Sequence, residues 1–543
     1  MKNNFGTPIK TTGISIVLIL LSFMIKGICK AQETRPDLQL DEYQIIGKDT
    51  RVFVFTGDRI STVSFIAQPL LLPEEERNVE ESEGLIDDEE RLWRLEPFEI
   101  TEGLYAHADI FSGSRSRANI WGKASLDKGK EAGTVHVGIR QSKENTPTNS
   151  APMIHEIDAV GYYGDTGTRF SAEIGYAGED NDFFGERFRN MKREVGRYHG
   201  GMTVRTLLRK LCDIIGRLNV TKGSYKDYVL SSDESEFEVG GGIDAVRDIY
   251  DVTLVFHSSA RYITLENDSG SFLMSGLKGQ LMLFDNLGLQ TGANIYLSAM
   301  PDDDTEARIY PEVNIDWAIT RSLFVKASYK PEVESYSYGD LYTRNGLVLP
   351  GSLLPAPMLF EDKRINAVGE IGWRYKPGSL ISASMFHTKS KDALVFNRFG
   401  NLFAVGKNAT VDITGVRIRI RYDRNGIWGF DGDITVNDAK CDNNDEVPYI
   451  PSTESVFCGY IIPYQRWIVR GSLNYMGKHY VETGMQDTVD AFFTVNCGIE
   501  RELLKQFSVY CDLRNITNSE GSWWTDRYQI PGVGLYAGVK MQY

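Results

Sequence analysis

One pattern recurs through most of this 543-residue chain. Segments of about ten residues, in which apolar and polar side chains alternate, are separated by clusters of Gly, Asp, Asn or Pro. In the last segment, one set of alternate residues is Val533, Leu535, Ala537, Val539, Met541 and Tyr543. The residues between them are Gly534, Tyr536, Gly538, Lys540 and Gln542. A period of two places the two sets on opposite faces of a β-strand. The sequence therefore predicts an all-β protein whose strands each have one apolar face.

The polar faces of these segments carry many charges. Arg417, Arg419 and Arg421 alternate with the apolar residues of one segment, Arg470 lies in a second and Arg514 in a third. Such charges do not suit the close-packed interior of a β-sandwich, although they could face water outside one. In a membrane barrel the five arginines would line the lumen. For the first three, the alternative is pairing with carboxylates on neighbouring strands.

Aromatic residues end several of the apolar stripes, as they do where membrane strands meet the lipid–water interface: Tyr329, Tyr422, Tyr475 and Tyr543. This favours a transmembrane antiparallel β-barrel over residues 95–543. Lipid offers no hydrogen-bond partners, so every strand of such a barrel must be paired. At roughly 40 residues per hairpin, this length gives about 22 strands. A barrel that wide is either a channel or is plugged.

The N-terminus has the features of a secretory signal peptide. Lys2 and Lys10 precede an apolar run over 14–25, and Cys29-Lys30-Ala31 places small residues at −3 and −1 of a cleavage site. We expect residues 1–31 to be removed and the mature chain to be exported to an outer membrane of the Gram-negative type. A lipoprotein at Cys29 is the less favoured alternative, because Ile28 stands where a small residue is required.

Residues 32–94 differ from the rest of the mature chain. Between Glu74 and Glu90 there are ten acidic residues and one Arg. Blocks of like charge are usually solvated linkers. We therefore expect a short N-terminal periplasmic segment with an acidic linker, followed by the barrel from residue 95.

Composition argues against several classes of function. A net charge of −15 does not suit a protein that coats nucleic acid, which needs a basic face. Seven scattered His and no recognisable nucleophile–base arrangement argue against an enzyme. No motif suggests a catalytic, cofactor or metal site. Five cysteines remain after Cys29, and Cys497 and Cys511 could lie opposite each other on adjacent strands, bridged or unbridged.

Motifs near the C-terminus carry a family resemblance. Residues 510–518 read YCDLRNITN, residues 528–532 read YQIPG, and a strand ending on Tyr543 follows. Shorter motifs precede them in matching order at 311–313, 361–364, 414–417 and 447–451. Together they resemble the barrel of TonB-dependent outer-membrane receptors.

This resemblance implies solute uptake or binding at the outer membrane, and Tyr543 would be the signal read by the outer-membrane assembly machinery. Family members carry a plug domain before the barrel, and no segment here resembles one. Residues 38–47 resemble the stretch that engages TonB, with Leu40, Tyr43, Ile45 and Ile46 as candidate contacts. The expected partners are outer-membrane lipid, TonB or a separate plug protein, and an unidentified solute.

Two alternatives to an uptake receptor remain open. One is an ungated porin-like channel. The other is a structural or adhesion protein whose outer loops, such as 332–362 and 515–530, bind another surface. A basic cluster between Arg187 and Lys210 would favour anionic solutes if it faced the lumen, or would meet acidic lipid or water if it lay in a loop.

Overall fold

The computed structural model describes residues 103–542 except for gaps in the connections between strands, of which the longest are 183–191, 345–357 and 522–531. The predicted signal peptide, residues 32–94 and Tyr543 lie outside the described residues, so their domain assignments stay predictions. Within the described part, no helix is long and apolar enough to cross a membrane.

The described residues form antiparallel strands and one short helix. The first half comprises β1 (Gly103–Phe111), β2 (Arg115–Asp127), β3 (Glu131–Glu144), β4 (Met153–Gly164), β5 (Thr168–Asp182), β6 (Lys192–Leu208), β7 (Cys212–Asp227), β8 (Ser232–Ile249), β9 (Val252–Leu265), β10 (Asp268–Phe284), β11 (Leu287–Ala299) and β12 (Glu306–Ala318). The second half comprises β13 (Leu323–Tyr329), β14 (Glu332–Ser337), α4 (Tyr338–Arg344), β15 (Met358–Lys376), β16 (Ser379–Phe399), β17 (Leu402–Arg424), β18 (Trp428–Lys440), β19 (Thr453–Ile461), β20 (Trp467–Met476), β21 (His479–Tyr480), β22 (Thr488–Val489), β23 (Phe492–Leu504), β24 (Phe507–Arg514) and β25 (Gly534–Gln542).

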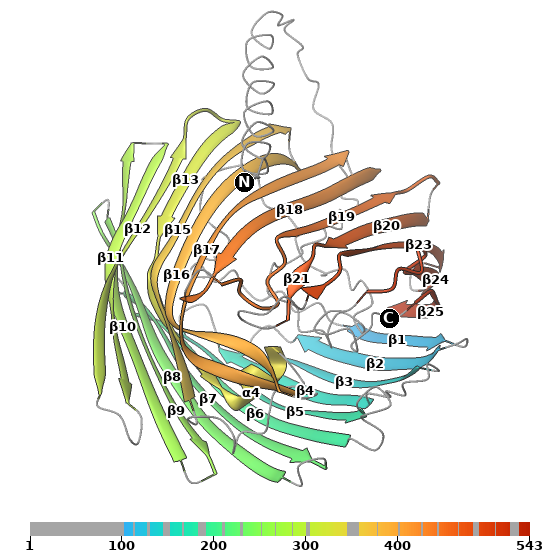
Figure 1. Cartoon of the computed structure of the whole chain (residues 1–543), viewed down its shortest axis with the longest axis horizontal. Coiled ribbons are helices and arrows are strands. Elements are labelled where there is room, and N and C mark those ends of the chain that lie inside the picture. The colour runs from blue at the N-terminus through green and yellow to red at the C-terminus, as the bar shows by residue number, and fades with distance from the viewer. Residues whose placement is uncertain are drawn as a thin grey trace, which may run out of the picture. The chain divides into compact units, whose positions relative to one another are not determined.

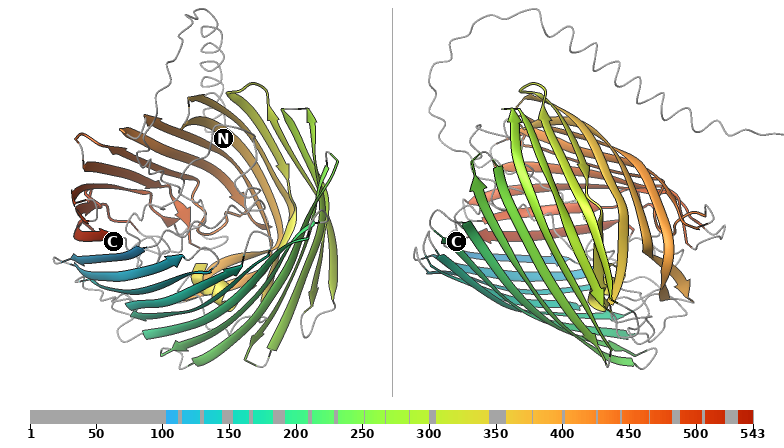
Figure 2. Two further views of the ribbon diagram at one scale, coloured as in Figure 1. Left: turned by 180° about the vertical axis from the view of Figure 1, so that it is seen from behind. Right: turned by 90° about the vertical axis from the view of Figure 1, so that its left-hand side faces the viewer.

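The large sheet closes on itself. Each strand pairs with its neighbours in turn, and β25 pairs with both β24 and β1, for example Val539 with Ala108. β13 and β14 run in line along β15, so the 23 strands of the sheet occupy 22 positions around the ring (Figure 1). Figure 2 shows the strands running obliquely, as barrel closure requires. The predicted all-β barrel of about 22 strands is confirmed.

The connections at the two ends of the ring differ in length. At one end they are tight turns, such as 377–378 between β15 and β16 and 505–506 between β23 and β24. At the other end lie long connections, such as 441–452, 477–491 and 515–533. We call these the short-turn end and the long-loop end. In membrane barrels the short turns face the periplasm and the long loops face outside.

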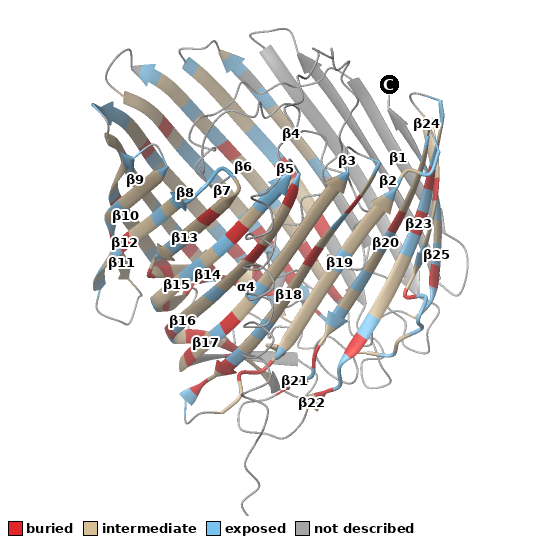
Figure 3. Ribbon diagram, turned by 90° about the horizontal axis from the view of Figure 1, so that it is seen from above, coloured by how far each residue is buried: buried red, intermediate tan, exposed pale blue. Residues whose placement is uncertain are grey.

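The strands have two distinct faces, as the alternation predicts. α4 lies inside the ring, so the face that contacts it is the inner face (Figure 1). Strand register extends this assignment from one strand to the next. From β5 to β25, where side chains are described, the outer face exposes apolar side chains, for example Ile174, Leu277, Met385 and Leu535. Figure 3 shows the resulting alternation of burial along the strands.

Aromatic residues mark both ends of the apolar outer face. Near the short-turn end, the Tyr422 ring lies 4.6 Å from that of Trp428, and the Trp373 ring lies 5.5 Å from that of Tyr375. Near the long-loop end, Tyr329 and Tyr475 are exposed. Two aromatic rims around an apolar band are typical of barrels that sit in a bilayer.

Glycines make room for aromatic rings on neighbouring strands. Gly372 pairs with Phe324 and Gly415 with Phe386. A Cβ atom at either glycine would overlap the facing ring. Larger residues at these positions would displace the ring, so the two pairs help to fix strand register.

Candidate functional site

A short segment leaves the wall at the long-loop end and enters the ring. It consists of β14 and α4, and we call it the crossing segment. β13 pairs with both β12 and β15, whereas the described pairing of β14 is with β15 alone. Pro331, which has no N–H to donate to a ladder, stands between β13 and β14. The chain therefore separates from β12 here, and α4 lies within the ring (Figures 1 and 3).

The sequence itself determines where α4 begins. The Ser337 Oγ accepts a hydrogen bond of 3.1 Å from the Asp340 N–H, and the Ser337 N–H donates one of 2.9 Å to Asp340 Oδ2. This reciprocal pair is a capping box, which satisfies N–H groups that the helix leaves free. A seven-residue helix is too short to be stable alone. Contacts with the wall must therefore stabilise it.

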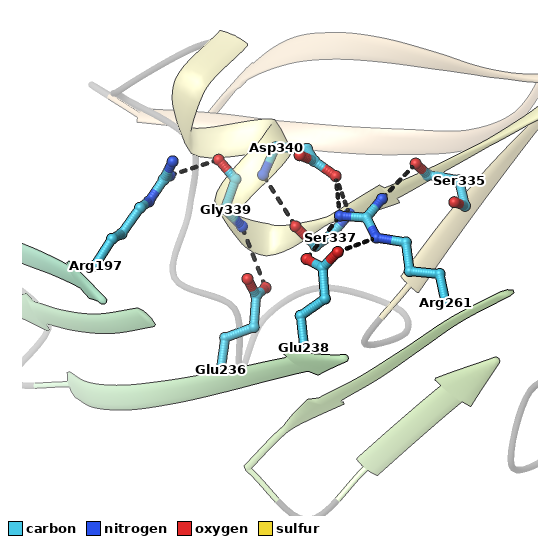
Figure 4. Close-up of polar contacts among 8 residues, drawn as sticks. All are labelled: Arg197, Glu236, Glu238, Arg261, Ser335, Ser337, Gly339 and Asp340. Atoms are coloured by element: carbon cyan, nitrogen blue, oxygen red, sulfur yellow. Dashed lines mark hydrogen bonds and ion pairs between the residues drawn. The ribbon is translucent and has the colours of Figure 1, made fainter. Parts of the chain in front are cut away.

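Wall side chains bind both ends of one residue of α4. Arg197 of β6 donates from Nη2 to the Gly339 carbonyl oxygen at 2.6 Å. The Gly339 N–H donates to Glu236 Oε2 of β8 at 3.2 Å. Opposite charges on two wall strands thus hold a single residue through its two polar backbone groups (Figure 4).

Arg261 of β9 links the wall to the crossing segment at several points. Its guanidinium donates to the Ser335 carbonyl oxygen at 3.0 Å and to Asp340 Oδ2 at 2.7 Å. It also forms a two-pronged ion pair with Glu238 of β8, at 2.6 Å and 2.8 Å (Figure 4). Bonds of this kind to charged groups are stronger than neutral ones. Arg261 therefore joins the wall directly to the capping box of α4.

Apolar packing completes the contact. The cluster of buried residues around the crossing segment comprises Val195, Tyr225, Leu265, Tyr336, Tyr338, Leu341, Tyr342, Leu359 and Val405. The Tyr225 and Tyr338 rings meet edge to face at 4.6 Å. Burial raises the pKa of the Tyr338 hydroxyl, which therefore stays neutral. Beside this cluster, Arg193 is buried in an ion pair of 2.5 Å with Asp227.

The hairpin of β16 and β17 bends over the crossing segment. Its register shifts between Ser390 and Val395, and Asp392 adopts a φ of 56°, which bends the strand pair. Beyond this point Leu394 and Phe396 pack against the cluster around α4. On its other side the hairpin packs against β18 and the 441–452 loop, through Ala393, Val395, Val411, Ala439, Cys441 and Val447. The long-loop mouth is therefore crossed by two packed elements.

The three predicted arginines of β17 form a charge ladder with β18. Arg417 Nε donates to Asp433 at 2.5 Å. Asp431 accepts from Arg421 at 2.7 Å and lies 3.5 Å from Arg419. Pairing with neighbouring carboxylates, the alternative left open by the sequence, is therefore present. Register puts all three arginines on the inner face, where each stays partly exposed.

The other two predicted arginines have different surroundings. Arg470 has its side chain 7% exposed and bound to Glu500, so a solute in the lumen could not reach it. Arg514 lies 4.4 Å over the ring of Tyr536, on the same face of the sheet. Leu40, Tyr43, Ile45, Ile46 and Tyr543 lie outside the described residues, and their roles stay predictions.

The crossing segment does not follow from the sequence pattern. The pattern predicts an outer loop over 332–362, yet 332–344 turn into the ring. In the basic cluster, Arg193 forms an ion pair with Asp227, and Arg197 donates a hydrogen bond to Gly339. Both side chains are therefore engaged with the protein itself. Two local signals are present in the sequence: Pro331 after a strand, and Ser337 three residues before Asp340.

No disulfide joins the cysteines of the described part. Cys497 pairs in register with Leu513, and Cys511 pairs with Ile499. The two cysteines are therefore offset along neighbouring strands and do not lie opposite each other.

No family model matches the sequence, and no curated protein matches it. Solved structures do match. The copper transporter OprC aligns with a TM-score of 0.66 at 12% identity, over 82% of each chain. A mutant of the ferric enterobactin receptor of Pseudomonas aeruginosa aligns with a TM-score of 0.63 at 11% identity, over 81% of this chain and 80% of that one. The ferric-catecholate import receptor Fiu from E. coli K12 aligns with a TM-score of 0.62 at 10% identity, over 82% of each chain.

The fold is therefore that of TonB-dependent outer-membrane receptor barrels, which confirms the resemblance inferred from the C-terminal motifs. At such low identity the likeness concerns the fold alone. Within the described residues, no plug-like domain accompanies the barrel.

Proposed function

We propose that this protein takes up or binds a solute at the outer membrane, through a barrel whose mouth its own chain narrows. The observation that carries the proposal is a closed 22-position ring with an apolar outer face, aromatic rims and a charged inner face. Pairing of β25 with β1 leaves the sheet without a free terminal strand, and the wet interior suits a polar passage. The relatives in fold are receptors and transporters by their names, which supports transport over catalysis.

A narrowed mouth favours selective uptake over an ungated pore. The crossing segment and the bent β16–β17 hairpin lie across the long-loop end, and buried side chains hold both. A porin-like channel of this width would leave the same space open. We further propose that the passage is controlled by a partner. Either residues 40–46 engage TonB, or a separate plug protein closes the barrel.

Single-channel recording of the refolded mature protein in a planar bilayer tests this function. With KCl as the probe, we expect a small steady conductance, well below that of an unobstructed ring of 22 strands. A large steady conductance, equal with and without residues 32–94, would instead identify an open pore. The absence of both conductance and solute binding would favour the structural or adhesion role.

The charge ladder should set the preference between anions and cations. Three arginines of β17 face two aspartates of β18. Replacing Arg417, Arg419 and Arg421 with Gln therefore changes the net charge of the ladder from positive to negative. We expect the permeability ratio of chloride to potassium to fall several-fold, on the order of the effect of charged rings in other pores. The reversal potential in a KCl gradient measures this ratio.

Arg501→Gln is the matched control for that experiment. Arg501 lies on the outer face, 4.9 Å over the ring of Trp467, and should leave the ratio unchanged. An unchanged ratio in the triple variant would show that permeating ions do not pass the ladder.

A further inference from the structure

We infer that the crossing segment is a strap latched to the barrel wall through Arg261, and that breaking this latch frees the strap and widens the mouth. This inference rests on the proposed function, because it identifies what limits passage.

The latch consists of side chains. Hydrogen bonds from the side chains of Arg197, Glu236 and Arg261 join the crossing segment to β6, β8 and β9. They converge on Ser335, Gly339 and Asp340, at the start of α4. Side-chain contacts of this kind can break without dismantling the wall, whose own ladders connect β6 to β9 continuously.

The wall remains electrostatically paired after release. Arg261 keeps its two-pronged bond to Glu238, since both residues belong to wall strands. Arg197 and Glu236, which hold opposite ends of Gly339, carry opposite charges and come from neighbouring parts of the wall. An undocked strap therefore does not leave the isolated buried charge that usually makes such a separation prohibitive. Two arrangements of the strap become accessible to one sequence.

The strap has a point about which to turn. Along the chain, the pairing of β13 with β15 ends at Tyr329, opposite Ala367. The pairing of β14 with β15 begins at Glu332, opposite Lys363. Between them lie Pro331 on one strand and a register shift next to Arg364 on the other. Both strands of the pair are thus irregular at the same height, directly before β14 leaves the wall.

Thiol labelling of the strap tests the latch independently of transport. Leu341 is fully buried in the docked strap, so a Leu341→Cys variant with the native cysteines replaced by Ala should react slowly with a membrane-impermeant maleimide. We expect Arg261→Ala to raise the labelling rate on the order of tenfold to a hundredfold, as expected for losing hydrogen bonds to charged groups. Asp340→Ala removes both the partner of Arg261 on the strap and the capping box of α4, and should raise the rate at least as much.

Arg205→Ala is the matched control. Arg205 makes a similar two-pronged pair with Asp213, has similar exposure and joins two wall strands, eight positions along β6 from Arg197. Its labelling rate should equal that of the parent. Equal rates in the Arg261, Asp340 and Arg205 variants would overturn the latch.

Conductance of the same variants separates this inference from the proposed function. Faster labelling together with a larger KCl conductance supports both. Faster labelling with no conductance in any variant keeps the latch and rejects passage through the barrel. Conductance that is present but equal in all variants, with unchanged labelling, keeps the passage and rejects the latch.

Discussion

Replacing Arg470 with Ala is expected to lower the free energy of unfolding of the barrel by about 3–5 kcal/mol. Arg470 of β20 binds Glu500 of β23, and the two side chains are only 7% and 5% exposed. Without the guanidinium, the Glu500 carboxylate stays buried with its charge no longer neutralised by that partner. Urea titration of the protein folded in lipid vesicles, followed by tryptophan fluorescence, measures the change.

A double variant distinguishes a broken ion pair from general loss of packing. Arg470→Met combined with Glu500→Leu removes both charges and should recover much of the lost stability, because apolar pairs of similar size often replace buried ion pairs at little cost. Lys226 and Asp233, whose charged atoms lie 3.9 Å apart at exposed positions, provide the comparison. Lys226→Ala should change stability by less than about 1 kcal/mol. A loss equally small at Arg470 would contradict the prediction.

A lysine on the outer face should destabilise the barrel in lipid. Leu277 of β10 is 57% exposed within the apolar band, and we expect Leu277→Lys to cost about 2–4 kcal/mol if that face contacts the bilayer interior. The physical reason is the cost of placing an ammonium group in hydrocarbon. The same urea titration in vesicles measures the cost.

The next strand offers a matched inner-face position. Gln290 of β11 lies on the inner face, opposite Gln280, which is three residues from Leu277 along β10. Gln290→Lys should be nearly neutral because that face is wet. Equal losses for the two lysines would mean that the outer face does not meet lipid, and would remove the main support for the membrane role.

Much of the wall can be predicted from the sequence because the two faces of a strand follow from residues that are close together in the chain. Alternation along Val416 to Tyr422 is enough to separate Arg417, Arg419 and Arg421 from the apolar face, whatever the rest of the chain does. Strand number follows from length alone, since each hairpin uses a similar stretch of chain. The carboxylate partners of the arginines cannot be named in this way, because they depend on the register between β17 and β18.

The crossing segment cannot be predicted for a related reason. Its contacts join positions far apart in the sequence: Arg197 and Gly339 are separated by 142 positions, and Arg261 and Asp340 by 79. No local periodicity distinguishes a strand that stays in the wall from one that turns inward. Pro331 and the capping box at Ser337 indicate an interruption followed by a helix, but not the direction in which the chain leaves.

The seam between β1 and β25 has a consequence for how the molecule is made. Tyr105 pairs with Gln542, so the first and last described strands are neighbours in space. A chain halted anywhere before its final strand would have two open sheet edges, each able to template pairing with other chains. The pairing of β1 with β25 joins segments at opposite ends of the barrel sequence, and it is expected to form slowly. The reason is that the loss of chain entropy opposes contacts between distant segments. The barrel can therefore close only after the last strand has been synthesised. A truncated chain is expected to aggregate instead of inserting as a smaller barrel.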